Sequence, residues 1–242
     1  YLLNNPTGAY RVNIGGTINV LEASRLMEVG KVVYISTNGI FTSKKYDPID
    51  EDHPVITANE GPGNGPYSIS KLASEAFGLF YGTNFSFTFI SLRPSAVYGF
   101  GMQYPMYIKP MVENSVKKLP THFDSGRGFP RDYTYVEDVV QAVYRAMDVN
   151  TDDLADRIFL VATGCPLITP GQIAEIIKGL IPDSNIEIGE GLTEWNKREI
   201  KYRGQINIGR AQKQLGYQPK YDIIKGIEDY ILMYSQYLKS KG

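Results

Sequence analysis

"KVVYIS", residues 31–36, is an almost unbroken run of apolar and β-branched side chains. Such a run is typical of a strand that is buried on both faces of a parallel sheet. Directly before it, apolar residues recur at helical spacing over residues 12–29 and Gly30 closes the pattern, which predicts an amphipathic helix. A helix that leads at once into a buried strand is typical of an α/β fold with a parallel sheet.

The same alternation continues along the chain. A long polar loop, rich in proline and glycine, runs through residue 65. Residues 66–82 then predict a helix with Pro66 in its first turn, and residues 86–94 predict a second buried strand. The other elements that we expect are helices over residues 105–118, 136–149, 170–180, 209–215 and 222–239, and strands over residues 157–163 and 185–188.

Composition excludes several classes of protein. With 43% hydrophobic and 21% charged residues and a net charge of −1, the 242-residue chain gives no electrostatic reason to expect nucleic acid or a membrane surface as a partner. No apolar run approaches the ~18 residues of a membrane span, so we expect neither an anchor nor an export signal. The single cysteine, Cys165, fits a reducing cytoplasmic setting without a zinc site. We expect His53 and His122 on the surface or in loops.

Polar side chains follow the two strongest strands at the points where these strands end. Residues 36–39 read Ser-Thr-Asn-Gly after the first strand, and Pro94 with the glycine-rich VYGFG at residues 97–101 follows the second. Tyr67 and Lys71 lie one turn apart at the start of the intervening helix. Ligands of open α/β sheets bind beyond the carboxyl ends of the strands. These segments are therefore the candidate site.

The Tyr-x-x-x-Lys spacing alone does not identify a proton-transfer pair. It occurs three times, at Tyr67 with Lys71, Tyr221 with Lys225, and Tyr237 with Lys241. Only the first pair follows a strand-end hydroxyl and precedes a proline-glycine segment. Context therefore favours Tyr67 and Lys71.

Six stretches resemble the extended short-chain dehydrogenase/reductase family, in its sugar-nucleotide epimerase and dehydratase branch. They stand in the family's order and span the chain from Asn13 to Pro219. The stretches are RVNIGGTINVLEA at 11–23, VVYIST at 32–37, PYSISKLASE at 66–75, LRPSAVYGFG at 92–101, RDYTYVEDVVQAV at 131–143 and RAQKQLGYQP at 210–219.

The resemblance implies a Rossmann-like parallel sheet with a smaller α/β C-terminal substrate-binding region. Residues 1–98 would be the remainder of the dinucleotide-binding domain, with the strand at 157–163 returning to it, and residues 99–242 would mainly bind substrate. Family members begin with a strand, a GxxGxxG turn and a helix, which have no counterpart in this sequence. We therefore expect a shortened chain that lacks roughly 60 to 80 N-terminal residues, has an exposed sheet edge and binds a dinucleotide poorly.

The resemblance also implies catalytic roles. Tyr67 would be the general base and acid, and Lys71 would stabilise its anion, because a phenol normally titrates at about 10. Thr37 would share the proton of the reacting sugar hydroxyl. Asn13 matches a helix asparagine that supports this network. For Thr37, capping of the local backbone is the alternative role.

Binding roles follow by the same resemblance. The cofactor would contact Tyr67, Lys71 and Ser36, and the backbone of Pro94, Ser95, Ala96 and Val97. The nucleotide sugar would contact Thr37, Asn38, Arg131 and Arg203, where the arginines suit a diphosphate. Arg198 competes with Arg203 for this role.

The strand-end sequence helps with the reaction. Family dehydratases carry an Asp-Glu pair where this chain has Asn38 and Gly39, which disfavours dehydration and also decarboxylation. The resemblance thus implies an NAD-dependent epimerase acting at C4 of a UDP-hexose or hexuronate, with NADP not excluded as the cofactor. An NAD(P)H-dependent reductase of a carbonyl or keto-sugar and a non-catalytic interaction module are the alternatives. It also implies a homodimer through the helices at 12–29 and 66–82.

Overall fold

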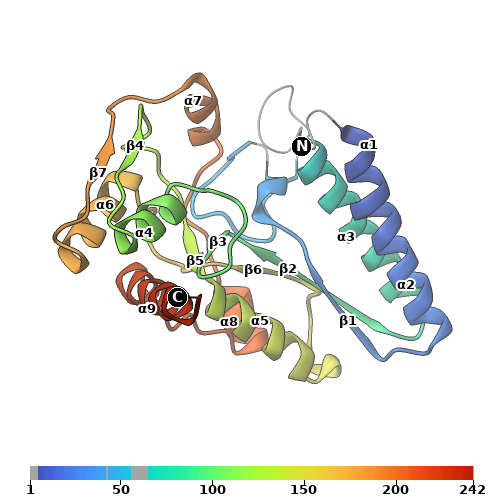
Figure 1. Cartoon of the computed structure of the whole chain (residues 1–242). Helices are drawn as coiled ribbons and strands as arrows, with labels where there is room; N and C mark the ends of the chain where they lie inside the picture. The colour runs from blue at the N-terminus through green and yellow to red at the C-terminus, as the bar shows by residue number, and fades with distance from the viewer. Residues whose placement is uncertain (1–4, 42, 56–64, 242) are drawn as a thin grey trace.

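The computed structural model describes residues 5–41, 43–55 and 65–241, and the part of the predicted loop at 56–64 lies outside them. The main sheet of the described residues is parallel and has the strand order β1-β2-β6. In its register Lys31 pairs with Thr88, and Ser91 pairs with Ile158. The strands are β1 (Lys31–Ile35), β2 (Thr88–Pro94) and β6 (Ile158–Val161) (Figure 1). The predicted α/β class with a parallel sheet is confirmed.

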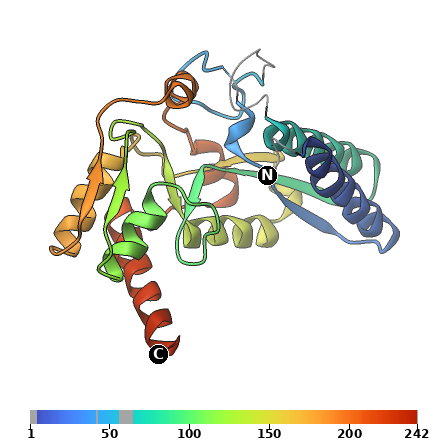
Figure 2. The ribbon, with the colours of Figure 1, turned by 45° about the horizontal axis from the view of Figure 1, so that its top comes forward.

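Helices cover both faces of this sheet. On one face α3 (Pro66–Asn84) lies beside α2 (Gly16–Leu26), and on the other lie α5 (Val136–Asp148) and α8 (Gly209–Leu215) (Figures 1 and 2). The central strand β2 is buried along almost its whole length. The outer strand β1 is only half-buried, and Ile35 is 37% exposed. The edge of the sheet at β1 is therefore open, as expected from the sequence.

Helix α3 approaches β2 closely because of two glycines. A Cβ built at Gly78 would lie 2.0 Å from the Phe89 ring, and one built at Gly82 would lie 2.8 Å from Phe89 Cβ, so larger residues there would push the helix from the sheet. The helix begins at Pro66 after Gly65, in the way a first-turn proline favours. This packing places Tyr67 and Lys71 near the carboxyl end of β1.

The helix predicted over residues 12–29 is three elements in the structure. They are α1 (Pro6–Ala9), a π-helix (Tyr10–Gly15) and α2, which ends at Leu26. The pattern of apolar residues could not show the π-helix. A single π-helical turn is only slightly wider than an α-helical turn, so the spacing of its side chains still looks α-helical. The predicted C-terminal limit was too late, since Glu28 has a φ of 53° and cannot continue a right-handed helix.

The second part of the molecule contains several short elements, of which the sequence predicted only the strand at 185–188. The strands β3 (Ala96–Tyr98) and β5 (Tyr133–Tyr135) pair in parallel, as do β4 (Thr121–Phe123) and β7 (Ile186–Ile188). Residues 96–98 form a strand, so the glycine-rich VYGFG segment begins inside β3. The helix α7 (Glu194–Ile200) was also missed. Three-residue strands show no measurable periodicity, so pairing alone defines them.

Long helices enclose a second core around these strands. Helix α9 (Ile223–Lys241) packs against α4 (Ile108–Val116) and α6 (Pro170–Leu180) (Figure 2). The core between them contains Tyr98, Tyr135 and Tyr230. No helix within the described residues is both long and apolar enough to span a bilayer. Those residues also hold no cluster of three or more ligand side chains suited to a metal ion.

His53 lies in a loop, one of the two places expected for it, and it is also buried, with only 2% of its surface exposed. Its Nε2 accepts a hydrogen bond from the Lys45 amide at 2.9 Å, and its ring packs between Phe41 and Tyr46. His122 is exposed. The burial of His53 depends on how the loop folds back on itself, which no local pattern shows.

Candidate active site

The segment after β1 presents a hydroxyl at the sheet edge. Ser36 is buried, and its amide donates to the Leu92 carbonyl at 2.7 Å, which continues the pairing with β2. Thr37 accepts a hydrogen bond from the Gly39 amide at 3.0 Å and so caps a short 3₁₀ turn (Asn38–Ile40). The hydroxyl hydrogen of Thr37 remains available. Both roles considered for Thr37, a local cap and a polar group at the site, are compatible.

The Thr37 hydroxyl interacts with the phenol of Tyr67. Although 45% of Tyr67 is exposed, the surrounding protein raises the pKa of Tyr67 above its usual value. The hydrogen bond with Thr37 acts in the opposite direction. Burial is the larger effect, so the pKa of Tyr67 in the described structure lies above its usual value.

The Lys71 ammonium is bonded to the end of β1. It donates to the carbonyl of Ile35 at the end of β1 and lies 4.6 Å from the centre of the Tyr34 ring. Burial lowers the pKa of Lys71, and the negative charge of Glu75 raises it. Lys71 is thus tied to the strand end.

Asn13 and Tyr67 are linked through serines that the sequence analysis missed. The Asn13 amide donates to Ser70 Oγ at 2.8 Å, and Ser70 Oγ donates to the Tyr67 carbonyl at 2.8 Å. The Ser74 hydroxyl contacts the Asn13 carbonyl at 2.9 Å. The spacing of Ser70 and Ser74 places them on one helix face, which was the available signal. Asn13 therefore reaches the helix that carries Tyr67 rather than the phenol itself.

A buried ion pair also fixes α3 to β2. Arg93 makes two hydrogen bonds to Glu75, at 3.1 and 2.5 Å, and Ser91 Oγ donates to the same carboxylate at 2.6 Å. The side chains of Arg93 and Glu75 are 5% and 2% exposed. Burial alone would raise the pKa of Glu75, but the hydrogen bonds and charge of Arg93, with smaller contributions from Ser91 and Ser36, hold it below its usual value.

The predicted cofactor wall crosses from one sheet to the other. Pro94 ends β2, Ser95 is buried between the strands, and Ala96 and Val97 are half-buried in β3. Val97 also lines a cavity with the backbone of Gly99 and other residues of the following turn. Gly99 has a φ of 146°, which disfavours any residue with a side chain.

The structure brings the two predicted arginines together. The guanidinium carbons of Arg131 and Arg203 lie 5.6 and 5.4 Å from the centre of the Phe129 ring. Burial, followed by the positive charge of Arg131, lowers the pKa of Arg203 to about 10. Arg131 Nε is buried without a hydrogen-bond partner in the described structure. Arg198 lies exposed on α7, so the structure favours Arg203 over Arg198.

Several cavities lie beside the arginines. One is lined by Asn38, Gly39 and Arg203, and so connects the strand-end segment to Arg203. Another is lined mainly by aromatic side chains with Arg131, among them Tyr107, Phe129 and Trp195. Asn13 and Lys71 line a different cavity, beside β1. The predicted substrate residues and the predicted helix network therefore face separate spaces.

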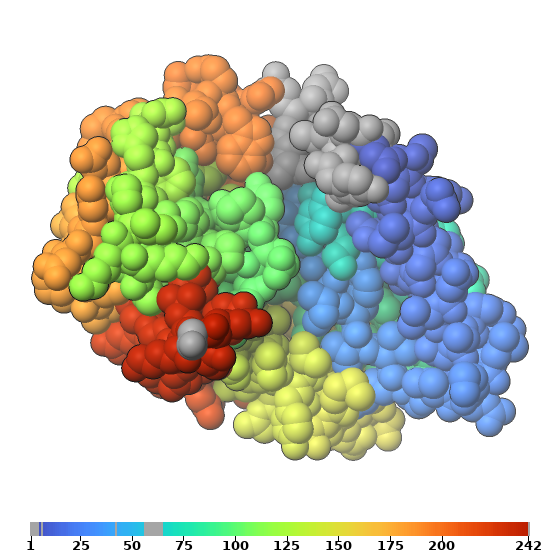
Figure 3. Space-filling view, in the orientation of Figure 1, coloured from blue at the N-terminus to red at the C-terminus, as the bar shows by residue number. Residues whose placement is uncertain are grey.

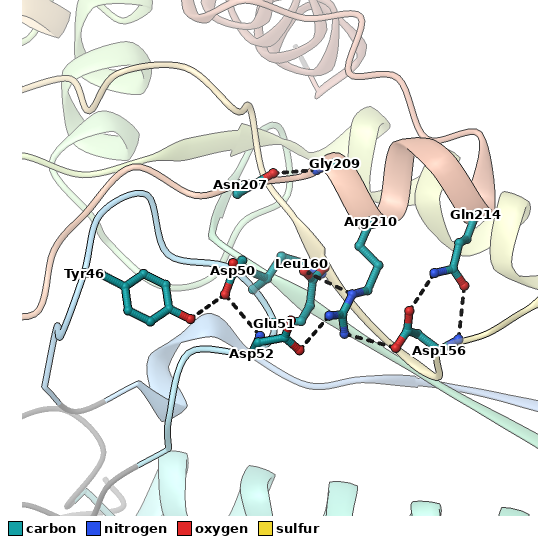
Figure 4. Close-up of polar contacts among 10 residues, drawn as sticks. All are labelled: Tyr46, Asp50, Glu51, Asp52, Asp156, Leu160, Asn207, Gly209, Arg210 and Gln214. Carbon is teal, nitrogen blue, oxygen red and sulfur yellow. Dashed lines mark hydrogen bonds and ion pairs between the residues drawn. The ribbon is translucent and has the colours of Figure 1, made fainter.

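The loop over residues 43–55 is anchored by Arg210 of α8 (Figure 4). The Arg210 guanidinium lies 3.6, 2.7 and 3.3 Å from the carboxylates of Glu51, Asp52 and Asp156, respectively. Glu51 also accepts a hydrogen bond from the Leu160 amide at 2.8 Å, which satisfies a donor of β6. Burial raises the pKa of Glu51, and the Leu160 amide and the charge of Arg210 oppose this shift. The anchor holds this loop against the main sheet.

Comparison with known proteins gives a consistent result. The model of the NAD dependent epimerase/dehydratase family matches residues 3–162. The chain is 28% identical over 238 residues to a UDP-glucose 4-epimerase of Mycolicibacterium smegmatis, covering 93% of this chain and 69% of that protein. It is 24% identical over 248 residues to a CDP-paratose 2-epimerase of Salmonella typhi, covering 93% of this chain and 71% of the relative.

A solved structure shows the same fold. The UDP-glucose 4-epimerase of Thermotoga maritima, determined with UDP-glucose, superimposes with a TM-score of 0.80 at 22% identity. The match covers 98% of this chain and 74% of the other.

Proposed function

The chain belongs to the NAD dependent epimerase/dehydratase family, and from this premise we propose that it epimerises a nucleotide sugar at C4 of a UDP-hexose or UDP-hexuronate. The observation that carries the proposal is that Thr37, at the end of β1, lies beside the first turn of α3, which carries Tyr67: a Cβ built at Gly39 would be 3.3 Å from Thr37 Oγ1 and 3.5 Å from Ser68 Oγ. NAD, when bound, supplies reversible hydride transfer. The residues present fit its nicotinamide end, because Lys71 offers donors for a ribose and Ala96 with Val97 offers a half-buried wall.

The proton chemistry would fall to Tyr67. With its pKa raised, the phenol is protonated at neutral pH in the chain alone, so it needs a nearby positive charge to act as a base. Thr37 would donate to the phenolate and orient the sugar hydroxyl between the two side chains. Asn13, through Ser70, would hold the first turn of α3 in place. Asn38 and Gly39 carry no group that could transfer a proton at neutral pH, which supports epimerisation over dehydration.

The nucleotide would bind at the arginine pair. Arg131 and Arg203 both lie against the Phe129 ring, and the positive charge of Arg131 acts on Arg203. Arg203 is already paired with Glu199 at 2.5 Å, whereas Arg131 Nε has no hydrogen-bond partner in the described structure, so Arg131 is the stronger candidate for holding an anion. The aromatic cavity beside Arg131 has faces suited to stacking with a base. A diphosphate flanked by a base and a sugar matches this arrangement.

The experiment that tests the function is incubation with NAD⁺ and UDP-galactose or UDP-glucuronate, followed by NMR of the sugar. Conversion to the C4 epimer without net change in the absorbance of reduced nicotinamide is the expected result. Net consumption of NAD(P)H with a keto-sugar would instead show a reductase. Since a family relative acts at C2, the position of inversion is read from the product spectrum.

We expect Arg131→Gln to weaken UDP binding about 10- to 100-fold, because a charge-assisted hydrogen bond contributes roughly 1.5–3 kcal/mol. Isothermal titration with UDP measures the change without any need for turnover. The matched control is Arg127→Gln, because Arg127 is 37% exposed and is already paired with Glu175 and Glu190. Equal losses in both variants would contradict a specific role for Arg131.

We also propose a homodimer that buries the outer face of α3. Ile69, Phe77 and Phe80 recur along this helix and are 49%, 41% and 55% exposed. The neighbouring α2 belongs to the blue region of Figure 3. Its Leu26 is 65% exposed. Phe80→Asp should shift the mass measured by analytical ultracentrifugation from dimer to monomer, because it places a charge in an apolar interface. Leu232→Asp, at an exposed site on α9, should leave the mass unchanged.

A further inference from the structure

A buried carboxylate lies between the predicted cofactor wall and the arginine pair. Asp132 follows Arg131 in sequence and is 5% exposed. Its Oδ1 accepts hydrogen bonds from Ser95 at 2.5 Å and Thr134 at 3.0 Å, and its Oδ2 accepts one from Thr163 at 2.6 Å. The side-chain partners of this charge are thus three hydroxyls. A buried carboxylate is retained only when such donors satisfy it.

The three hydroxyls come from three separate strands. Ser95 directly follows β2, Thr134 lies in β5, and Thr163 lies just after β6. The Ser95 and Thr134 hydroxyls are also 2.6 Å from each other. Asp132 therefore links the carboxyl ends of β2 and β6 in the main sheet to the small sheet formed by β3 and β5.

We propose that Asp132 is a positioning residue that fixes the Ser95–Val97 segment in register with Arg131. The inference rests on the proposed function, because it assigns the two ends of this link to cofactor and nucleotide. In an epimerase the sugar carbon must reach the cofactor while the diphosphate stays on the arginines. The distance between these two anchors then decides whether the reacting atoms meet.

Two features make Asp132 suited to this task. Its backbone continues into that of Arg131, whose amide and carbonyl are both paired with Ile168, at 2.9 and 3.0 Å. Its side chain holds Ser95, whose amide in turn donates to the Val161 carbonyl at 2.9 Å. The main chain of Asp132 is thus connected to Arg131, the proposed nucleotide ligand, and its side chain is bonded to Ser95 of the proposed cofactor wall. Reacting groups displaced by about 1 Å can lose roughly 100-fold in rate.

The test is a double-mutant cycle of Asp132→Ala and Ser95→Ala, read from NAD⁺ affinity by titration and from turnover of UDP-galactose. Each single variant should lower both quantities by about 10- to 100-fold, and the double variant should lose no more than the worse single one. Asp132→Asn should recover most of the loss, because its amide oxygen can face Ser95 while its NH₂ group donates to Thr163. Unfolding midpoints are measured for every variant.

Thr163→Val is the matched control. The change removes the hydroxyl that donates to Asp132 Oδ2 at 2.6 Å, whereas Ser95 donates to the other oxygen, Oδ1, at a similar distance. It should lower the unfolding midpoint as Ser95→Ala does and leave NAD⁺ affinity and turnover unchanged. Equal functional losses for Thr163→Val and Ser95→Ala, or additive losses in the cycle, would overturn the proposal. If the NAD⁺ affinities of the variants follow the expected non-additive pattern but the wild type does not turn over UDP-galactose, the role of Asp132 stands and only the proposed epimerisation is contradicted.

Discussion

Tyr67→Phe should lower the turnover number for the C4 epimerisation by about 10²- to 10⁴-fold, the usual contribution of general acid–base catalysis. The change removes only the hydroxyl that faces Thr37, so the ring and its packing at the start of α3 remain. UDP affinity should stay close to that of the wild type, because the arginine pair lies on other elements. Steady-state kinetics and UDP titration on the same preparation measure both effects.

The chain supplies a control with the same local spacing. Tyr237 stands four residues before Lys241 and is 42% exposed on α9, with the Lys241 ammonium 5.7 Å from its ring. Tyr237→Phe should leave turnover unchanged. Near-normal turnover of Tyr67→Phe would falsify the assignment of Tyr67 as the acid–base residue. Tyr221 is a poorer control, because its ring packs against Tyr135 at 4.6 Å.

Glu75→Gln should lower the free energy of unfolding by about 3–5 kcal/mol, because it leaves the guanidinium of Arg93 buried without its counter-charge. The pair is almost completely buried and joins the helix that carries Tyr67 to the central strand. Urea denaturation followed by circular dichroism measures the change. Glu22→Gln is the control, because Glu22 forms an ion pair with Arg25 at the surface, three residues along α2. Removing this exposed pair should change the free energy of unfolding too little to measure.

The effect of Glu75→Gln should also depend on pH. The folded-state pKa of Glu75 lies below its unfolded value, which is about 4.3. The ionised Glu75 therefore contributes fully to the free energy of unfolding above the unfolded-state pKa. This contribution is lost as pH falls through the folded-state pKa. The difference in stability between wild type and Glu75→Gln should be constant from about pH 7 to 5 and shrink at lower pH. A difference that grew on acidification would show that Glu75 is not held as an anion.

The local signals in the sequence were reliable where they were long. Residues 170–180 and 209–215 form helices with the predicted limits, and residues 31–36 contain β1. The three-residue strands β3, β4 and β5 were missed, because each is shorter than two periods of a strand, whereas β7 lies within the strand predicted at 185–188. The helix predicted at 12–29 had the right location but concealed a π-helix.

For the candidate site, the sequence could name chemical groups but not their partners. Thr37, Tyr67, Arg131 and Arg203 were identified by motif and by position after strands. Ser70, Glu75 and Asp132 were not, because the role of each depends on a side chain 18 to 57 residues away. The direction of the Tyr67 pKa also depends on burial at the start of α3, which no local pattern shows.

The sequence by itself therefore determined the α/β alternation, the strand-end positions and the set of functional groups. Periodicity and the residues that begin and end helices act within a few residues, so a single stretch such as KVVYIS is sufficient to reveal them. The tertiary structure alone decided that Arg203 rather than Arg198 meets Arg131, that His53 is buried, and that Asp132 joins two sheets. These are properties of packing, because desolvation and hydrogen-bond partners arise only when distant segments come together.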